Sequence, residues 1–164
     1  MPAPSGNPSE GAGPGSRLSQ LGIVLPAPPT PLGAYVEAAD AGNLLFLAGT
    51  LPVVNGKLAF TGRLGENLPV KDGQEAARIA SLNALAIAKE HLGDLDRLKK
   101  LVKLTVLMAT TSEFTGLAAV ADGASNLFAQ IFGPQTGHAR LVYGAQTLPL
   151  GAPVIVDTIF EIKR

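Results

Sequence analysis

One arginine in the last third of the chain is a candidate for binding an anion. Arg140 opens the apolar segment Ala139–Ala145 and follows the small, Gly-containing stretch 133–137. The guanidinium group is planar, and its paired N–H donors match a carboxylate bidentately. The local sequence leaves two roles open for Arg140: an anchor for a small anionic ligand, or a salt bridge to an acid of the same or a neighbouring chain.

Asp157 is the carboxylate with the most unusual surroundings. It lies within the apolar segment Val154–Ile162 and shares its strand parity with Ile155 and Ile159. An acid in such a segment is expected either at the edge of a subunit or in a cleft. We therefore treat Asp157 as a candidate acid–base group.

Several other kinds of chemistry lack the residues that they need. The chain has no Cys, which excludes disulfides, thiolate catalysis and Cys-based metal sites. Its two histidines, His91 and His138, fall in different predicted elements, so we predict no metal site. Neither a Gly-x-Ser-x-Gly elbow nor a Walker-type loop is present. A net charge of zero and 5% aromatic residues argue against nucleic-acid binding.

Length and composition indicate one folded domain behind a tail. Residues 1–16 are rich in Pro, Gly and Ser and cannot bury enough apolar surface to offset their ordering entropy, so we predict a flexible tail there and a single domain over 17–164. No apolar run approaches the roughly 20 residues of a membrane span. The N-terminus also lacks the pattern of a signal peptide, and we expect a cytoplasmic protein.

Two long helices are expected to carry most of the helical structure. The first is Val70–Leu92, and the second begins after a cap at Thr111 or Ser112 and ends at Gly133. A short helix is predicted over Arg17–Leu25. The apolar stripe of the second long helix comprises Leu117, Val120, Ala121, Ala124, Leu127, Phe128 and Ile131.

The strands are expected on either side of these helices. The predicted ranges are Tyr35–Ala38, Leu44–Gly49, Val53–Leu58 as a tight hairpin around Asn55-Gly56, Leu101–Ala109, Ala139–Ala145 and Val154–Ile162. This order predicts an α+β sandwich, with two main helices packed on one face of a mixed sheet. Both parities of the last strand are apolar, and a partner subunit is the simplest cover for the second face.

Six short motifs follow one another in a recognisable order. They are Gly33-Ala34-Tyr35, the run 42–52, the strand Leu101–Met108, His138-Ala139-Arg140, Leu148-Pro149 and a final acidic apolar strand. Together they resemble the RidA/YjgF family, formerly described as the L-PSP endoribonuclease family, over roughly residues 17–164. The resemblance implies a chorismate-mutase-like sandwich that assembles as a homotrimer, with ligand clefts between subunits.

The resemblance also implies a function and a set of site residues. Family members hydrolyse reactive enamines and imines, such as 2-aminoacrylate and its 2-imino acid tautomer, to 2-keto acids and ammonia, without a cofactor. By motif match, Arg140 would bind the substrate carboxylate with help from the backbone of Val142. Tyr35 and Gly49 would line the cleft, whereas Ala48 stands where the family has a serine.

One position departs from the family pattern. Counted without gaps from Arg140, the glutamate that positions the attacking water corresponds to Ile155, which can neither accept a proton nor hold a water. Asp157 matches a second acidic position, about 6.6–6.8 Å further along the strand. Three functions follow: an imine deaminase with Asp157 as its acid–base group and a more apolar pocket, a trimeric small-carboxylate-binding protein without turnover, or RNA cleavage, against which the composition argues.

Overall fold

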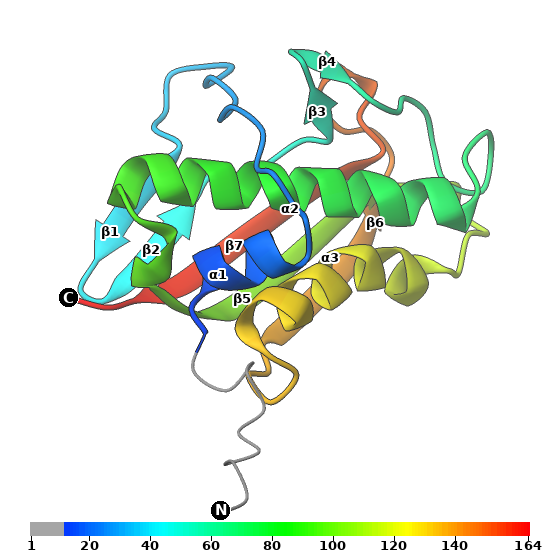
Figure 1. The fold of residues 1–164 in the computed structure, drawn as a ribbon. Helices are drawn as coiled ribbons and strands as arrows, with labels where there is room; N and C mark the ends of the chain where they lie inside the picture. The colour runs from blue at the N-terminus through cyan, green and yellow to red at the C-terminus, as the bar shows by residue number, and fades with distance from the viewer. Residues whose placement is uncertain (1–11) are drawn as a thin grey trace, which may run out of the picture.

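A computed structural model describes residues 12–164 as a five-stranded sheet with its helices on one face (Figure 1). The helices are α1 (Pro14–Gln20), α2 (Val70–Leu92) and α3 (Leu117–Phe132), with short 3-10 turns at Leu95–Arg97 and Pro149–Gly151. The strands are β1 (Ala38–Ala41), β2 (Leu44–Leu47), β3 (Val53–Val54), β4 (Lys57–Leu58), β5 (Leu98–Ala109), β6 (Ala139–Ala145) and β7 (Val154–Ile162).

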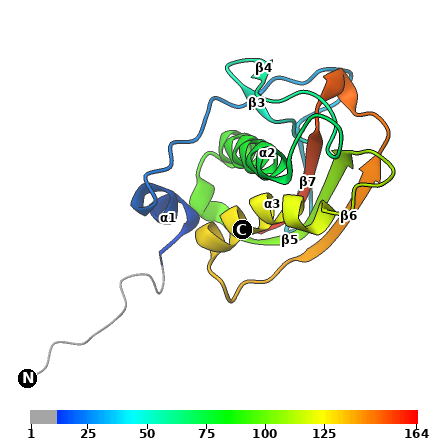
Figure 2. The same ribbon diagram turned by 90° about the vertical axis from the view of Figure 1, so that its right-hand side faces the viewer.

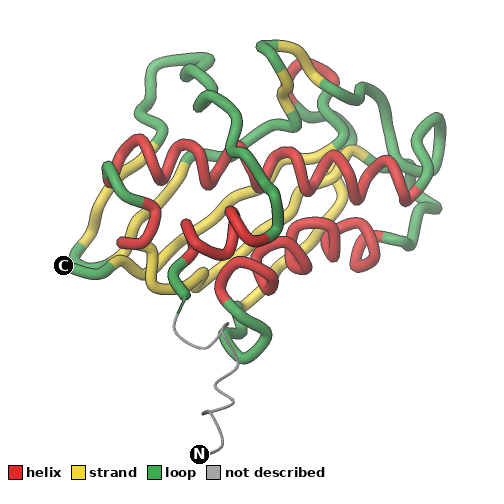
Figure 3. The backbone as a smooth tube through the Cα atoms, viewed as in Figure 1, coloured by secondary structure: helices red, strands yellow, loops and turns green. Residues whose placement is uncertain are grey.

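The sheet is mixed and has the order β1-β2-β7-β5-β6. Only β5 and β6 are parallel, because α3 carries the chain back between them, as the tube in Figure 3 shows. The short β3–β4 hairpin stands apart from the main sheet and turns at Asn55 and Gly56, as predicted. The predicted α+β sandwich with helices on one face is confirmed.

Small side chains let α2 lie close to the sheet. The helix begins after Pro69 and ends at Gly93, which adopts a left-handed conformation. Its buried face is built largely from alanines, with Leu85, Ile87 and Leu92 as the large aliphatic members. The bounds of α2 therefore match the predicted helix.

Aromatic packing fixes α3 over the centre of the sheet. Phe128 on α3 is almost fully buried, and its ring centroid lies 5.9 Å from that of Phe160 on β7 in an edge-to-face contact. Phe132 completes the group, and its ring centroid lies 6.4 Å from that of Phe128 and 6.0 Å from that of Phe160. These contacts hold the polar flank of α3 beside β6.

The backbones of α2 and α3 meet at Gly123. A Cβ atom at this position would lie only 2.1 Å from the backbone oxygen of Gln74, so any larger residue clashes with α2. The side chain of Gln74 also donates a hydrogen bond to the backbone oxygen of Ala119, at 2.9 Å. The backbone of α3 at Gly123 therefore lies in direct contact with α2.

The sheet face opposite the helices carries exposed apolar side chains. Figure 2 shows all three α-helices on the same side of the sheet. On the other side, Phe46, Leu141 and Tyr143 are 40%, 48% and 45% exposed. This second face therefore carries apolar side chains, as the sequence predicted.

Several predicted elements have other bounds in the structure; for example, β2 ends at Leu47 rather than Gly49, and β5 begins at Leu98 rather than Leu101. The helix predicted over Arg17–Leu25 runs instead from Pro14 to Gln20, because Pro14 supplies a favourable first turn. The predicted tail therefore loses 14–16 to α1, while its residues 1–11 lie outside the described part of the chain.

Two further differences concern β1 and the cap of α3. The strand predicted at Tyr35–Ala38 begins only at Ala38, because the Tyr35 hydroxyl accepts a hydrogen bond from the Leu32 N–H at 3.0 Å and closes a turn. Thr111 and Ser112 do not cap α3, whose N-cap is Gly116 with no side-chain hydrogen bond. Within residues 12–164, no helix is both long and apolar enough to cross a bilayer.

Candidate functional site

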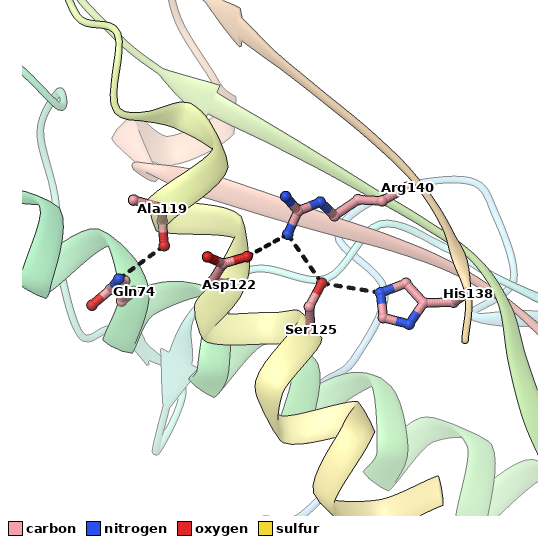
Figure 4. A network of polar contacts seen from close by, with 6 residues as sticks. All are labelled: Gln74, Ala119, Asp122, Ser125, His138 and Arg140. Carbon is pink, nitrogen blue, oxygen red and sulfur yellow. Dashed lines mark hydrogen bonds and ion pairs between the residues drawn. The ribbon is translucent and has the colours of Figure 1, made fainter. Parts of the chain in front are cut away.

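Arg140 lies on the edge strand β6 and turns its side chain toward α3. Its Nη1 atom donates to Asp122 Oδ1 at 2.7 Å and to Ser125 Oγ at 3.2 Å (Figure 4). Asp122 and Ser125 are three residues apart, which places them on one face of the helix. The salt bridge that the sequence left open for Arg140 is therefore present within the chain.

The opposite edge of the guanidinium remains available. Within residues 12–164, neither Nε nor Nη2 of Arg140 makes a hydrogen bond, and Figure 4 shows both turned away from Asp122 and Ser125. The side chain is 26% exposed. A guanidinium held through one nitrogen, with its Nε–Nη2 edge open, is preorganised for a planar carboxylate.

His138 completes the group around Arg140. Its Nε2 atom lies 3.0 Å from Ser125 Oγ, and it precedes Arg140 by two residues on the same side of the extended chain. Burial lowers the pKa of His138, and the charge of Arg140 lowers it further. The neutral imidazole can accept a hydrogen bond from the Ser125 hydroxyl group, while the oxygen of that group accepts a hydrogen bond from Arg140.

Ile155, Asp157 and Gly49 lie on the other face of the sheet. Val154 and Val156 are buried under the helices, so the alternating residues Ile155 and Asp157 face away from them. A Cβ atom at Gly49 would lie 2.7 Å from Cγ2 of Ile155. Ile155 thus fills the space directly above Gly49 with a methyl group.

Burial raises the pKa of Asp157, partly opposed by a hydrogen bond from the Thr158 backbone. The folded chain therefore binds this proton more tightly than the unfolded chain. The charged carboxylate destabilises the fold, so the stability of the protein falls as the pH rises above about 3.9, the pKa of Asp in the unfolded chain.

Asp157→Asn is expected to raise the melting temperature at pH 7 but not at pH 3. An unchanged or lower value at pH 7 would contradict this assignment.

The predicted site residues form two groups at different places in the fold. Arg140 and Val142 share the helix-facing side of β6, where Val142 packs against the core. Tyr35 precedes β1, the opposite edge strand, which lies four strand spacings, or roughly 19 Å, from β6. A single chain does not bring Arg140 together with Tyr35 or Asp157.

The sequence did not single out Asp122 and Ser125. Both flank the apolar stripe of α3 at a spacing of three residues, and this was the available signal. Among the described residues, no group of three or more His, Cys, Asp or Glu could hold a metal ion. A surface groove of about 510 Å³ between α2 and α3 contains none of the predicted site residues.

The mixed sheet with its helices on one face is a chorismate-mutase-like fold, and comparison with known proteins gives the family. The profile of the family described as "YjgF/chorismate_mutase-like, putative endoribonuclease" matches residues 15–162. The chain belongs to this YjgF/RidA family.

The chain is similar to relatives of nearly the same length. It is 41% identical to Protein TCP17 of Trypanosoma cruzi, over 91% of this chain and 94% of that protein. A protein of unknown function from Agrobacterium tumefaciens has a similar crystal structure, with 39% identity, a TM-score of 0.80 and 90% of each chain covered. The crystal structure of a Shewanella oneidensis protein described as a "putative endoribonuclease" is also similar, with 32% identity and a TM-score of 0.88. The match covers 92% of this chain and 100% of that chain.

Proposed function

We propose that this protein binds small 2-imino and 2-keto carboxylates through Arg140 and hydrolyses enamine or imine intermediates to keto acids and ammonia. The observation that carries the proposal is the open Nε–Nη2 edge of Arg140, beside an Nη1 atom fixed by Asp122 and Ser125. Two parallel N–H donors on a rigid fork match one carboxylate. No cofactor takes part in this proposal.

The site is proposed to lie between copies of the chain, in a homotrimer. Arg140 and Val142 occupy one edge of the sheet, while Tyr35 and the Gly49–Ile155 contact lie elsewhere. A neighbouring copy that covers the exposed face around Phe46 and Tyr143 would also bring these two groups together. A trimeric mass in light scattering supports the arrangement, and a monomeric mass contradicts it.

The activity is tested by generating 2-iminopropanoate in situ and following its loss with and without the protein. An acceleration that disappears in Arg140→Ala supports the proposal. Either no acceleration, or an acceleration that this variant retains, rejects turnover at this site.

A binding protein without turnover is the second candidate. It is favoured by Ile155, whose methyl group covers Gly49 and leaves this position without a group that could position water. Thermal stabilisation by pyruvate that is lost in Arg140→Ala, together with no loss of the imine, supports this alternative.

The two candidates predict different responses to an acid at position 155. If the site holds an imine beside Ile155, Ile155→Glu is expected to raise the rate of imine loss at least tenfold, because general acid–base help typically contributes about 10²–10⁴-fold. Ile159→Glu is the matched control, since it adds the same charge to the same face of β7 four residues further along the strand. An unchanged rate in Ile155→Glu, with pyruvate binding intact, contradicts a reacting group at this position.

A further inference from the structure

Ser125 links Arg140 to His138 through a single oxygen atom. Arg140 Nη1 lies 3.2 Å from Ser125 Oγ, and His138 Nε2 lies 3.0 Å from the same atom (Figure 4). Arginine is always charged and can only donate, so Ser125 Oγ accepts a hydrogen bond from Arg140. The one hydroxyl proton of Ser125 is then available to His138, whose Nε2 atom accepts a hydrogen bond only in the neutral imidazole.

A proton on His138 Nε2 changes this arrangement. Arg140 and His138 would then both donate to Ser125 Oγ, and the hydroxyl proton of Ser125 would have to turn to another acceptor. Two positive charges would also face each other across one oxygen atom. The geometry therefore favours a neutral His138 as long as no anion lies on the open edge of Arg140. Burial first, and the charge of Arg140 second, lower the pKa of His138, in agreement with this geometry.

The other charged groups around His138 keep their places when a ligand binds to that edge. Asp122 on α3 contacts Arg140 from the opposite side of the guanidinium. Lys103 on β5 lies on the other face of the sheet, since the next residue of that strand is fully buried under the helices. Arg17 on α1 lies beside the glycine that ends α3. A ligand on the open edge of Arg140 therefore adds one negative charge to an otherwise fixed set.

A carboxylate on this edge offsets the positive charge that His138 faces. It would lie on the order of 10 Å from the imidazole, which is about one Debye length at moderate ionic strength. The added negative charge would raise the pKa of His138, because it stabilises the imidazolium form. Linkage is reciprocal, so a proton on His138 strengthens carboxylate binding by the same factor.

We propose that His138 makes the Arg140 anchor sensitive to pH, because a carboxylate on Arg140 and a proton on His138 bind cooperatively. The inference rests on the proposed function, in which Arg140 holds the ligand carboxylate. Affinity is highest below the pKa of His138 in the ligand-free protein, which is lowered from the ordinary value. It falls as the pH rises to the pKa of His138 in the complex and is constant above that pKa. Mildly acidic conditions therefore favour occupancy of the site.

The first test follows the histidine ring C2–H signals of the full chain by NMR between pH 5 and pH 8, with and without saturating pyruvate. The chain has only two histidines, His91 and His138, and His138→Gln assigns their signals. Pyruvate is expected to shift the titration of His138 to higher pH. His91 is the internal control and should titrate identically in both samples, because it pairs with Asp40 at the other edge of the sheet.

The second test measures pyruvate affinity by calorimetric titration at pH 5 and pH 8. Wild type is expected to bind pyruvate about threefold more tightly at pH 5. His138→Gln cannot titrate but keeps a carbonyl acceptor for Ser125, so its affinity should be equal at the two pH values. His91→Gln is the matched control and should keep the pH dependence of wild type. Thermal melts check that each variant is folded.

Two results overturn the coupling between His138 and the anchor. One is pyruvate binding that leaves the titration of His138 in place or shifts it to lower pH, and the other is an unchanged pH dependence in His138→Gln. If pyruvate binds wild type at neither pH, the proposed function fails and the inference fails with it. Pyruvate binding that Arg140→Ala leaves intact would reject the carboxylate anchor itself.

Discussion

Arg140→Ala is expected to weaken pyruvate binding about 100-fold, which corresponds to about 2.8 kcal/mol. The substitution removes two N–H donors on one rigid edge, and hydrogen bonds to charged groups are worth about 1.5–3 kcal/mol each. It also leaves Asp122 and Ser125 without their common partner. The rate of imine loss at low substrate concentration should fall by a similar factor, because Arg140 is proposed to hold the substrate carboxylate.

Two further variants make the Arg140 experiment specific. Arg140→Lys keeps the charge but loses the planar fork, so its affinity should lie between wild type and Arg140→Ala. Arg78→Ala removes an arginine from the exposed surface of α2, where it pairs with Glu75, and should leave binding unchanged. Equal pyruvate affinities in wild type and Arg140→Ala would contradict the assignment of the anchor.

Gly123→Ala is expected to destabilise the protein by about 2–3 kcal/mol. The new Cβ atom would lie 2.1 Å from the backbone oxygen of Gln74, and backbone cannot move aside as a flexible side chain can. Overpacking of this kind typically costs about 1–3 kcal/mol, and the rigid neighbour places this site at the upper end. Urea unfolding of both proteins measures the difference.

Gly137→Ala is the control for a change of glycine to alanine. A Cβ atom at Gly137 meets no atom within 4 Å, so this variant should keep or slightly raise stability. Gly123 directly follows Asp122 on α3, so a shift of the helix at Gly123 should also weaken pyruvate binding. Unfolding free energies equal within about 0.5 kcal/mol for wild type and Gly123→Ala would show that α2 and α3 separate without cost.

Local signals in the sequence were sufficient for the long elements. α2 begins after Pro69 and ends at Gly93 in a left-handed turn, as the helical period and the glycine stop predicted. β7 alternates between buried and partly exposed residues along an apolar segment. Errors arose where a long-range or single-residue contact decides the conformation, as at Tyr35, whose hydroxyl closes a turn in place of a strand.

The site could be predicted only in part. Arg140 was identified from its residue type and motif, but its partners Asp122 and Ser125 depend on how α3 lies over β6. The prediction that Asp157 shares a face of β7 with Ile155 and Ile159 was correct. Its face relative to Arg140, however, depends on the registers that β5 forms with β6 and β7, which no local pattern encodes.

The most direct measurement is a crystal structure of the protein with pyruvate. The account predicts the pyruvate carboxylate on the Nε–Nη2 edge of Arg140, while Nη1 keeps its contacts with Asp122 and Ser125. Pyruvate bound away from Arg140, or an acidic side chain of a neighbouring copy on that edge in its place, would contradict the central claim that Arg140 anchors a small carboxylate.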